Sequence, residues 1–401
     1  MKAAGAALPR MDAAPKARAA FADSGLGRGW EPAVLILCTF LLLGFGLVNL
    51  YSASAFMAQE AGLPDYHYVL RQAGGAALGV LAMVICARIP YHWWRYAAWP
   101  LLGLAWVLLV LTVLPWTHEL APVRNGARRW LELGVTVQPA ELAKVAVVAW
   151  TAMMAVRKEA HFKSLTQGLL PFLLVWAVLL IPILLQPDLS TAALVAALGV
   201  MVAFMGGARP GHFAFLGLLL LPLMGRYLES GFRQDRMAVF AGEATGAAGY
   251  QTHQALVTLG SGGLSGAGFG EGRQKFGFLP EPHNDFIFAM IGEEWGFMGT
   301  LILLALYSAV VLVGFRIAGS LRDRFGQLLA AGLTAMVGLQ ALLHIGVSLG
   351  LFPPTGLPLP LVSYGRSSLV VTLVAMGILL SLSRPRHQTA ALRAPEVGRA
   401  G

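Results

Sequence analysis

The sequence predicts an all-α integral membrane protein, built as a bundle of ten transmembrane helices. Of its 401 residues, 57% are hydrophobic and only 12% are charged, which is about half the charged share of soluble domains. The apolar residues fall into stretches long enough to cross a bilayer, which takes roughly 20 residues. The hydrophilic segments between them are too short to fold alone, so we expect one membrane domain over 32–383.

Ten stretches qualify as membrane spans by their length and apolar content. They are 32–53, 69–87, 96–115, 140–156, 168–186, 188–206, 212–226, 286–314, 327–350 and 364–383. Span 140–156 has the weakest boundaries because it contains Glu141 and Lys144, and the pair 168–186 and 188–206 is tightly spaced. The longest connecting segment, 227–285, lies between the seventh and eighth spans. An even number of spans places both chain ends on one side of the membrane.

The distribution of basic residues predicts which side that is, since cytoplasmic loops are enriched in Lys and Arg. The two tails and the loops on their side hold 18 of the 29 Lys and Arg residues, and the opposite loops hold 8. We therefore expect cytoplasmic tails at 1–31 and 384–401 and an extracytoplasmic loop at 227–285, in a membrane that borders the cytoplasm. The net charge of +9 follows from this asymmetry, so nucleic acid is not an expected partner.

The tail 1–31 is basic and lacks an apolar core, so it is interpreted as a disordered segment and not as a cleavable signal peptide. Cys38 and Cys86 both lie within predicted spans, which favours neither a disulfide nor a metal site. The sequence contains neither a P-loop nor a G-x-G-x-x-G pattern, so ATP and nicotinamide cofactors are not expected. The glycine-rich run 260–272 is either a flexible loop or a backbone that approaches a phosphate.

Polar clusters at membrane depth locate the candidate site, because burying charge in lipid is costly and marks function. All of them adjoin the predicted outer face, where the longer loops also lie. The clusters are 125–130 with 138–144, 186–188, 279–296 and the proline-rich turn 353–368. So much proline fixes an irregular backbone, which is tolerated at this depth only against protein or a water-filled cavity.

These segments carry a family resemblance. N-G-A-R-R-W, Q-P-A-E-L-A-K, Q-P-D-L, Q-K-F-G-F-L-P-E-P-H-N-D-F-I-F-A and G-L-P-L-P-L-V-S-Y-G resemble, in order, the motifs of the SEDS family, which contains the FtsW and RodA proteins. The resemblance extends from about 32 to 383, and the basic tail and I-G-E-E-W-G-F-M-G are more similar to FtsW than to RodA. It implies a peptidoglycan glycosyltransferase that polymerises lipid II into β-1,4-linked strands during septal wall synthesis and releases undecaprenyl pyrophosphate.

The resemblance also implies partners and a catalytic residue. FtsW-like proteins work with a class B penicillin-binding protein, which is a transpeptidase, and with other membrane proteins of the division complex. The essential aspartate of the family falls on Asp285, which would be the general base for the acceptor 4-hydroxyl. A partly desolvated carboxylate suits that role because desolvation raises its pKa toward the working pH. From the residues alone, Asp285 is equally well explained as an N-cap of the following span.

Further residues are candidates for substrate binding. Glu281 and His283 alternate with Asp285 and would share one side of an extended segment. They either orient the motif or hold a divalent cation, Mg²⁺ or Mn²⁺, at the pyrophosphate. The His and Cys pattern requires no protein-held metal, and no tightly bound cofactor is expected. Glu141 and Lys144 either pair with each other or, as part of the site, place Lys144 at a substrate phosphate.

The remaining candidates are external basic and polar residues. An arginine cluster suits a dianionic pyrophosphate by bidentate contact, although lipid headgroups would explain it equally well. Arg233 and Arg236 are weaker candidates of the same kind. The substrate-binding candidates of this group are Arg124, Arg128, Arg129, Gln274, Lys275 and Ser363.

Three positions depart from the family pattern, and two other functions remain open. Arg366 replaces a common glycine, His344 a common asparagine and Asn284 a common threonine. A lipid II flippase would also use buried charges and broken helices, but it would expose polar groups near both faces. A non-catalytic division scaffold would not need an acidic group at the mouth of a cavity.

Overall fold

The computed structural model describes residues 29–124, 126–162, 164–214, 217–218, 225 and 247–384. The described chain is helical apart from one two-stranded antiparallel sheet, in which Leu131 pairs with Val137. The first half contains α2 (Glu31–Glu60), α3 (His67–Arg88), α4 (Trp93–Val113), β1 (Leu131–Glu132), β2 (Thr136–Val137), α5 (Pro139–Lys158), η1 (Glu159–His161), η2 (Leu165–Leu169), α6 (Leu170–Leu185) and α7 (Leu189–Met205). The second half contains α10 (Ala247–Ser261), α11 (Ile287–Ser320), α12 (Arg324–Ser348) and α13 (Arg366–Leu382).

The protein is a multi-pass helical membrane protein. Seven helices of the described chain are long and apolar enough to cross a bilayer, and α7 and α13 are shorter apolar helices. Together these helices coincide with nine of the ten predicted spans. The seventh predicted span, 212–226, lies mostly outside the described residues, as do nearly all of the two tails, so the count of ten stays a prediction.

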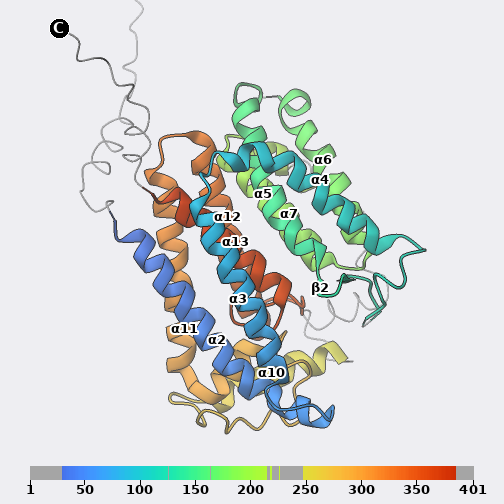
Figure 1. Ribbon diagram of the computed structural model, residues 1–401, viewed down its shortest axis with the longest axis vertical. Helices are drawn as coiled ribbons and strands as arrows, with labels where there is room; N and C mark the ends of the chain where they lie inside the picture. The colour runs from blue at the N-terminus through green and yellow to red at the C-terminus, as the bar shows by residue number, and fades with distance from the viewer. Residues whose placement is uncertain are drawn as a thin grey trace, which may run out of the picture.

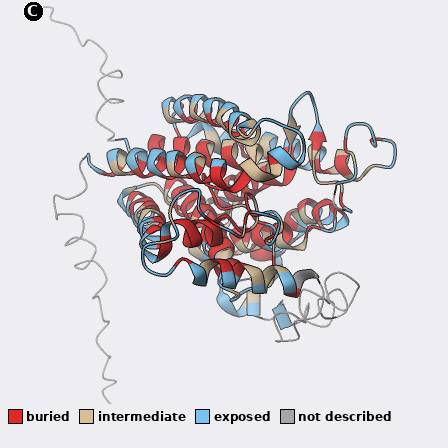
Figure 2. Cartoon of the chain, turned by 90° about the horizontal axis from the view of Figure 1, so that it is seen from below, coloured by how far each residue is buried: buried red, intermediate tan, exposed pale blue. Residues whose placement is uncertain are grey.

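The helices form two groups that meet at α5. In Figure 1, α2, α3, α11, α12 and α13 lie together, and α4, α5, α6 and α7 form the second group. Helix α5 contacts both α12 and α13 across the divide. Of the seven long helices, α5 and α12 are the most buried, while the other five expose large apolar side chains. Figure 2 shows exposed residues along the outside of the bundle. The weakest predicted span is therefore the centre of the bundle, which is why it can carry Glu141 and Lys144.

Helix α3 approaches α13 closely along much of its length (Figure 1). A methyl group built on Gly377 would lie 2.4 Å from the carbonyl oxygen of Met83, and one on Gly79 would lie 2.5 Å from Leu373. Small residues permit such contact between membrane helices, where packing replaces the hydrophobic effect as the driving force. This contact brings the N-terminal ends of α3 and α13 to the same end of the bundle, next to the site described below.

Helix α11 is interrupted at Gly296, which the hydropathy of span 286–314 did not reveal. Gly296 has φ 66° and ψ −163°, a conformation that strongly favours glycine. The interruption frees backbone groups, and the glycine-rich run satisfies them. Ala267 N–H donates to the Glu293 carbonyl at 2.9 Å, and Phe297 N–H donates to the Gly263 carbonyl at 2.9 Å. The backbone of this run therefore packs against the broken helix, and the flexibility of 260–272 stays a prediction.

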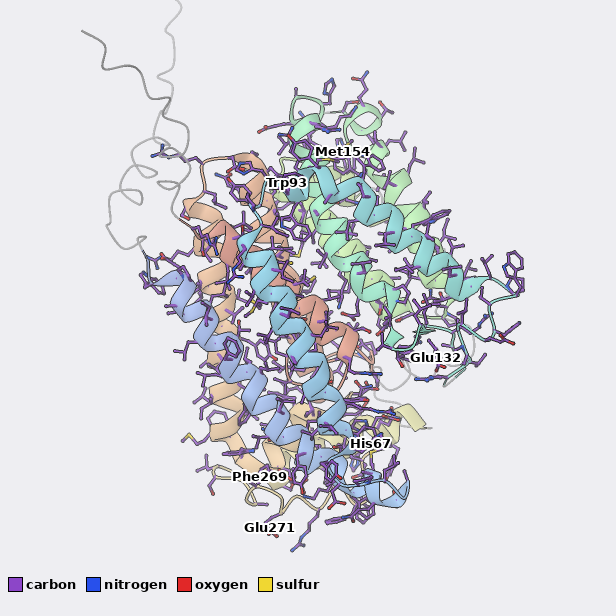
Figure 3. The ribbon with its side chains drawn as sticks, viewed as in Figure 1. His67, Trp93, Glu132, Met154, Phe269 and Glu271 are labelled. Atoms are coloured by element: carbon purple, nitrogen blue, oxygen red, sulfur yellow. The ribbon has the colours of Figure 1, made fainter. Side chains whose placement is uncertain are left out.

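The described part of the long segment 227–285 contains a helix. Its described part begins with α10, which packs on α11 and α12. Residues 226–246 lie outside the described chain. Figure 3 places segments from the same predicted side of the membrane at the same end of the bundle. The labelled residues His67, Glu132, Phe269 and Glu271 lie toward one end, and Trp93 and Met154 toward the other.

Candidate active site

Residues 281–285 form a turn immediately before α11. The N–H groups of Asn284 and Asp285 both donate to the Glu281 carbonyl, at 3.2 and 3.1 Å. The expected extended segment, with Glu281, His283 and Asp285 on one side, is therefore wrong. Phe286 occupies the N-cap position of α11, so Asp285 lies one residue earlier and the N-cap explanation of this aspartate is wrong as well.

The proline-rich turn lies opposite Asp285. A methyl group built on Gly356 would lie 3.8 and 4.0 Å from the two carboxylate oxygens of Asp285. Ser363 joins the two segments, because its hydroxyl donates to the Asn284 carbonyl at 2.8 Å and accepts from Leu359 N–H at 2.9 Å. Two polar clusters that are far apart in the sequence therefore meet at one partly buried carboxylate.

His283 is held between two tyrosines. Its ring centroid lies 5.0 Å from that of Tyr68 on α3 and 5.5 Å from that of Tyr364, and Tyr364 N–H donates to the His283 carbonyl at 3.1 Å. His283 is only 4% exposed, and this burial lowers the pKa of its imidazole to about 4. The ring is therefore neutral near pH 7, and its Nε2 lies 3.9 Å from the half-exposed carboxylate of Glu281.

The two tyrosines were not predicted as site residues, because aromatic residues near a membrane surface are usually interfacial anchors. Tyr364 adjoins Ser363 in a family motif, which was a usable signal. No sequence motif marked Tyr68. Only its ring contact with His283, which lies in the other half of the chain, identifies it as a site residue.

Side chains from the spans hold the proline-rich turn in place. Proline has no N–H to donate, so the turn depends on donors outside its own backbone for its carbonyl groups. His344 Nδ1 lies 2.8 Å from the Leu357 carbonyl oxygen, and Gln340 Nε2 donates to the Pro358 carbonyl at 2.8 Å. Tyr307 on α11 donates to the Pro360 carbonyl at 2.5 Å.

Glu141 and Lys144 form a buried ion pair, which confirms one of the two alternatives for these residues. Lys144 Nζ lies 2.7 Å from Glu141 Oε2, and both residues are 1% exposed. Lys144 also donates to Gln340 Oε1 at 2.5 Å. Contact of Lys144 with a substrate phosphate stays a prediction that these contacts do not favour.

The three external arginines have partners within the protein. Arg128 donates to the carbonyls of Leu114 and Ala121 and to Thr117 Oγ1, at 3.0, 2.9 and 3.2 Å, and so holds the loop after α4 together.

Arg129 reaches the segment between α6 and α7, where it donates to the Pro187 carbonyl at 2.9 Å and lies 3.6 Å from Asp188. Arg124 forms an exposed ion pair with Glu132. Because its side chain is the most exposed, Arg124 is the most available of the three for an anionic ligand.

Lys275 and Gln274 belong to a polar cluster at the break in α11. Lys275 Nζ is buried, 3.4 Å from Glu294 Oε1, and donates to the Gly270 carbonyl at 2.5 Å. Gln274 N–H lies 3.4 Å from Glu293 Oε1. These contacts bind the loop to α11, and a substrate role for either residue stays a prediction. Arg233 and Arg236 lie outside the described residues.

A cation site was the alternative for the Glu281 segment. Among the residues that the structure describes, no group of three or more His, Cys, Asp or Glu side chains could hold a metal ion. The described side chains therefore do not form a cation site by themselves, and a divalent cation at the pyrophosphate stays a prediction.

Arg366 adopts an ordinary helical backbone at the start of α13, because the non-glycine residues with positive φ in the described chain are Pro187, Glu281 and Leu361. This confirms the expectation that the turn tolerates a side chain there. The Arg366 stem packs on α3, where a methyl built on Gly75 would lie 3.1 Å from its Cγ.

We therefore expect Arg366→Gly to change glycan synthesis by no more than a few-fold, because the Arg366 stem packs on α3 and its backbone is ordinary helix. Initial rates of the purified variant and the parent protein measure this. A large gain would mean that Arg366 impairs the native chain, and a complete loss would make it a substrate ligand.

Comparison with known proteins agrees with this architecture. A family model for FtsW, RodA and SpoVE, described as "Cell cycle protein", matches residues 32–388. Stage V sporulation protein E of Bacillus subtilis is 39% identical over 356 residues, which cover 88% of this chain and 96% of that protein. The probable peptidoglycan glycosyltransferase FtsW of Geobacter metallireducens is 37% identical over 354 residues, covering 87% and 94%.

Solved structures show the same fold. The rod shape determining protein RodA of Thermus thermophilus matches with a TM-score of 0.66 and 30% identity, over 91% of this chain and 99% of that one. A chain from a peptidoglycan synthase complex, described as coordinating polymerization and crosslinking, matches with a TM-score of 0.74 and 29% identity, over 88% and 98%. The chain therefore belongs to the FtsW/RodA/SpoVE family.

Proposed function

We propose that this protein is a peptidoglycan glycosyltransferase, which polymerises lipid II into β-1,4-linked glycan strands at the outer face of the cytoplasmic membrane. The observation that carries the proposal is the carboxylate of Asp285. Asp285 lies just before a span, in a turn braced by Ser363 and two tyrosines. Its carboxylate faces the proline-rich turn. Relatives at 36–37% identity over most of the chain carry the name probable peptidoglycan glycosyltransferase.

The proposed reaction is one displacement with inversion. Asp285 accepts the proton of the acceptor 4-hydroxyl while that oxygen attacks the anomeric carbon of the donor. The new C–O bond forms as the bond from the anomeric carbon to the pyrophosphate oxygen breaks, and undecaprenyl pyrophosphate leaves with the electron pair. General base catalysis requires the carboxylate to be held still and partly shielded from water, and the contacts of the two turns supply both conditions.

The remaining site residues have supporting roles in this proposal. His283 is neutral and fixes the turn that carries Asp285, as does Ser363. Arg124 is the external cation best able to reach a pyrophosphate, since its ion pair with Glu132 is exposed.

A transpeptidase partner is part of the proposal. The related chain from a peptidoglycan synthase complex comes from an assembly that coordinates polymerization and crosslinking. A class B penicillin-binding protein is the partner that this likeness supports. The FtsW relatives support a septal role, together with other membrane proteins of the division complex.

The proposed topology places the candidate site outside and both termini inside. In a background lacking Cys38 and Cys86, a cysteine at exposed Glu271 should react with an impermeant thiol reagent in intact cells, and one at exposed Arg322 should not. Permeabilised cells provide the control, because both positions should then react. The opposite pattern in intact cells would place the Asp285 site in the cytoplasm, where no glycan is made. The equivalent test position Glu243 lies outside the described residues.

The direct test uses purified protein and labelled lipid II, with and without a class B penicillin-binding protein. We expect a ladder of glycan chains that a muramidase digests, together with release of undecaprenyl pyrophosphate. If neither product forms in the presence of the partner, the proposed function is wrong.

A further inference from the structure

A chain of buried polar contacts connects the centre of the bundle to the proline-rich turn. It begins at the ion pair of Glu141 and Lys144 on α5 and passes to Gln340 on α12, whose Oε1 accepts from Lys144 at 2.5 Å. Gln340 Nε2 then donates to the Pro358 carbonyl at 2.8 Å and lies 3.3 Å from Ser368 Oγ. Glu141, Lys144 and Gln340 are each 1–2% exposed.

The charge of Lys144 fixes which way the Gln340 amide points. A side-chain amide has an acceptor oxygen on one side and a donor NH2 on the other. If the amide turned over, its NH2 would face the ammonium of Lys144, and its oxygen would face the carbonyl oxygen of Pro358. Both contacts would be repulsive in a buried site, where electrostatic interactions are strong. Glu141 holds the ammonium in place and neutralises its charge.

The orientation of this amide matters because the turn has few N–H groups of its own. Val362 and Ser363 N–H donate to the Leu359 carbonyl, whereas the Pro358 carbonyl accepts from Gln340. Pro353, Pro354, Pro358 and Pro360 lack the N–H groups that backbone hydrogen bonds require. Pro358 is two residues from Gly356, the position that faces the Asp285 carboxylate. Losing the Gln340 donor would deprive the partly buried Pro358 carbonyl of this bond, so the turn would shift and Gly356 would move relative to Asp285.

We propose that Lys144 is a positioning residue: it orients Gln340, which holds the proline-rich turn against the catalytic carboxylate. The inference rests on the proposed function only in treating Asp285 as catalytic. It replaces the expected contact of Lys144 with a substrate phosphate, because the ammonium already has a carboxylate and an amide oxygen as partners. Lys144 therefore acts on the turn from within the bundle.

The test combines a structural readout with a kinetic one. The variants are Gln340→Leu, which leaves the ion pair intact, and the double variant Glu141→Leu with Lys144→Met. The double variant removes both charges together, because deleting only one would leave an uncompensated buried charge. Thr151→Val is the matched control. Thr151 is also buried on α5, but its hydroxyl bonds to Trp176, away from the turn.

Hydrogen–deuterium exchange of the peptide 355–365 reports the turn without any need for activity. We expect faster exchange in this peptide for both test variants, by about tenfold or more, and parental exchange for Thr151→Val. With labelled lipid II, kcat should fall about 10- to 100-fold, as expected for a displaced catalytic group, while KM changes less than threefold. A triple variant that combines Gln340→Leu, Glu141→Leu and Lys144→Met should show little further change in exchange or kcat, since all three substitutions interrupt one chain of contacts.

Two results would overturn the inference. One is unchanged exchange in 355–365 for Gln340→Leu. The other is a raised KM with unchanged kcat in the double variant, which would make Lys144 a substrate ligand. Should the double variant fail to fold, Gln340→Leu decides alone. Absence of glycan synthesis by the parent protein would refute the proposed function, and the exchange result would still decide whether Lys144 positions the turn.

Discussion

Replacing Asp285 with asparagine should lower the rate of glycan polymerisation by about 10²- to 10⁴-fold, the contribution expected of a general base. Asparagine keeps the size of the side chain but does not accept a proton. The neighbouring contacts of Ser363, Tyr364 and Gly356 use backbone groups or close packing, so the turn should keep its shape. The measurement is the initial rate with labelled lipid II, taken on protein whose melting temperature matches the parent.

The matched control is Asp65→Asn. Asp65 lies in the loop between α2 and α3, where its carboxylate accepts from Gln59 at 3.0 Å. The substitution makes the same chemical change at another loop carboxylate and should leave the rate unchanged. An Asp285→Asn protein that made glycan at near-parental rates would show that another group takes the proton.

Replacing Gly266 with alanine should strongly destabilise the protein. Gly266 has φ 82°, and a methyl group built on it would lie 2.2 Å from the Glu294 carbonyl oxygen and 2.7 Å from Gly296 N. The left-handed backbone costs an alanine about 1–2 kcal/mol, and forcing a methyl into a packed contact costs about 1–3 kcal/mol more. We expect a loss of about 2–5 kcal/mol in the free energy of unfolding, measured by denaturation in detergent.

Alanine substitutions at two neighbouring glycines separate the backbone cost from the packing cost. Gly263 has φ 55°, and no described atom lies within 4 Å of a methyl built there, so Gly263→Ala should show the backbone cost alone. Gly260 lies within α10 in equally open surroundings, and Gly260→Ala should be neutral or slightly stabilising. Equal stability of the Gly266 and Gly260 variants would mean that the glycine-rich run does not pack against α11 as described.

Most of the membrane architecture was predictable because it depends on local composition. Apolar runs of sufficient length gave nine spans that coincide with helices, including α5 in spite of its two charges. The break in α11 was not predictable, since one glycine in an apolar run barely changes its hydropathy. The packing of the glycine-rich run against α11 depends on that break, because its backbone bonds to the N–H and carbonyl groups that the break frees.

The candidate site was predictable in its residues but not in its geometry. Family motifs pointed to Asp285 and Ser363, whereas alternation wrongly favoured an extended segment where the chain makes a turn. The contact between Lys144 and Gln340 was not predictable either, because Gln340 is 196 positions away and belongs to no polar cluster in the sequence. Contacts between distant segments decide what a buried charge does, and a single sequence does not contain them.

One measurement distinguishes a polymerase from a flippase directly. Proteoliposomes containing the purified protein, a class B penicillin-binding protein and labelled lipid II allow glycan formation and transbilayer movement of lipid II to be followed in the same vesicles. The account predicts muramidase-sensitive glycan that depends on Asp285, with lipid II movement no faster than in vesicles lacking the protein. Protein-dependent movement of lipid II without any glycan would contradict it.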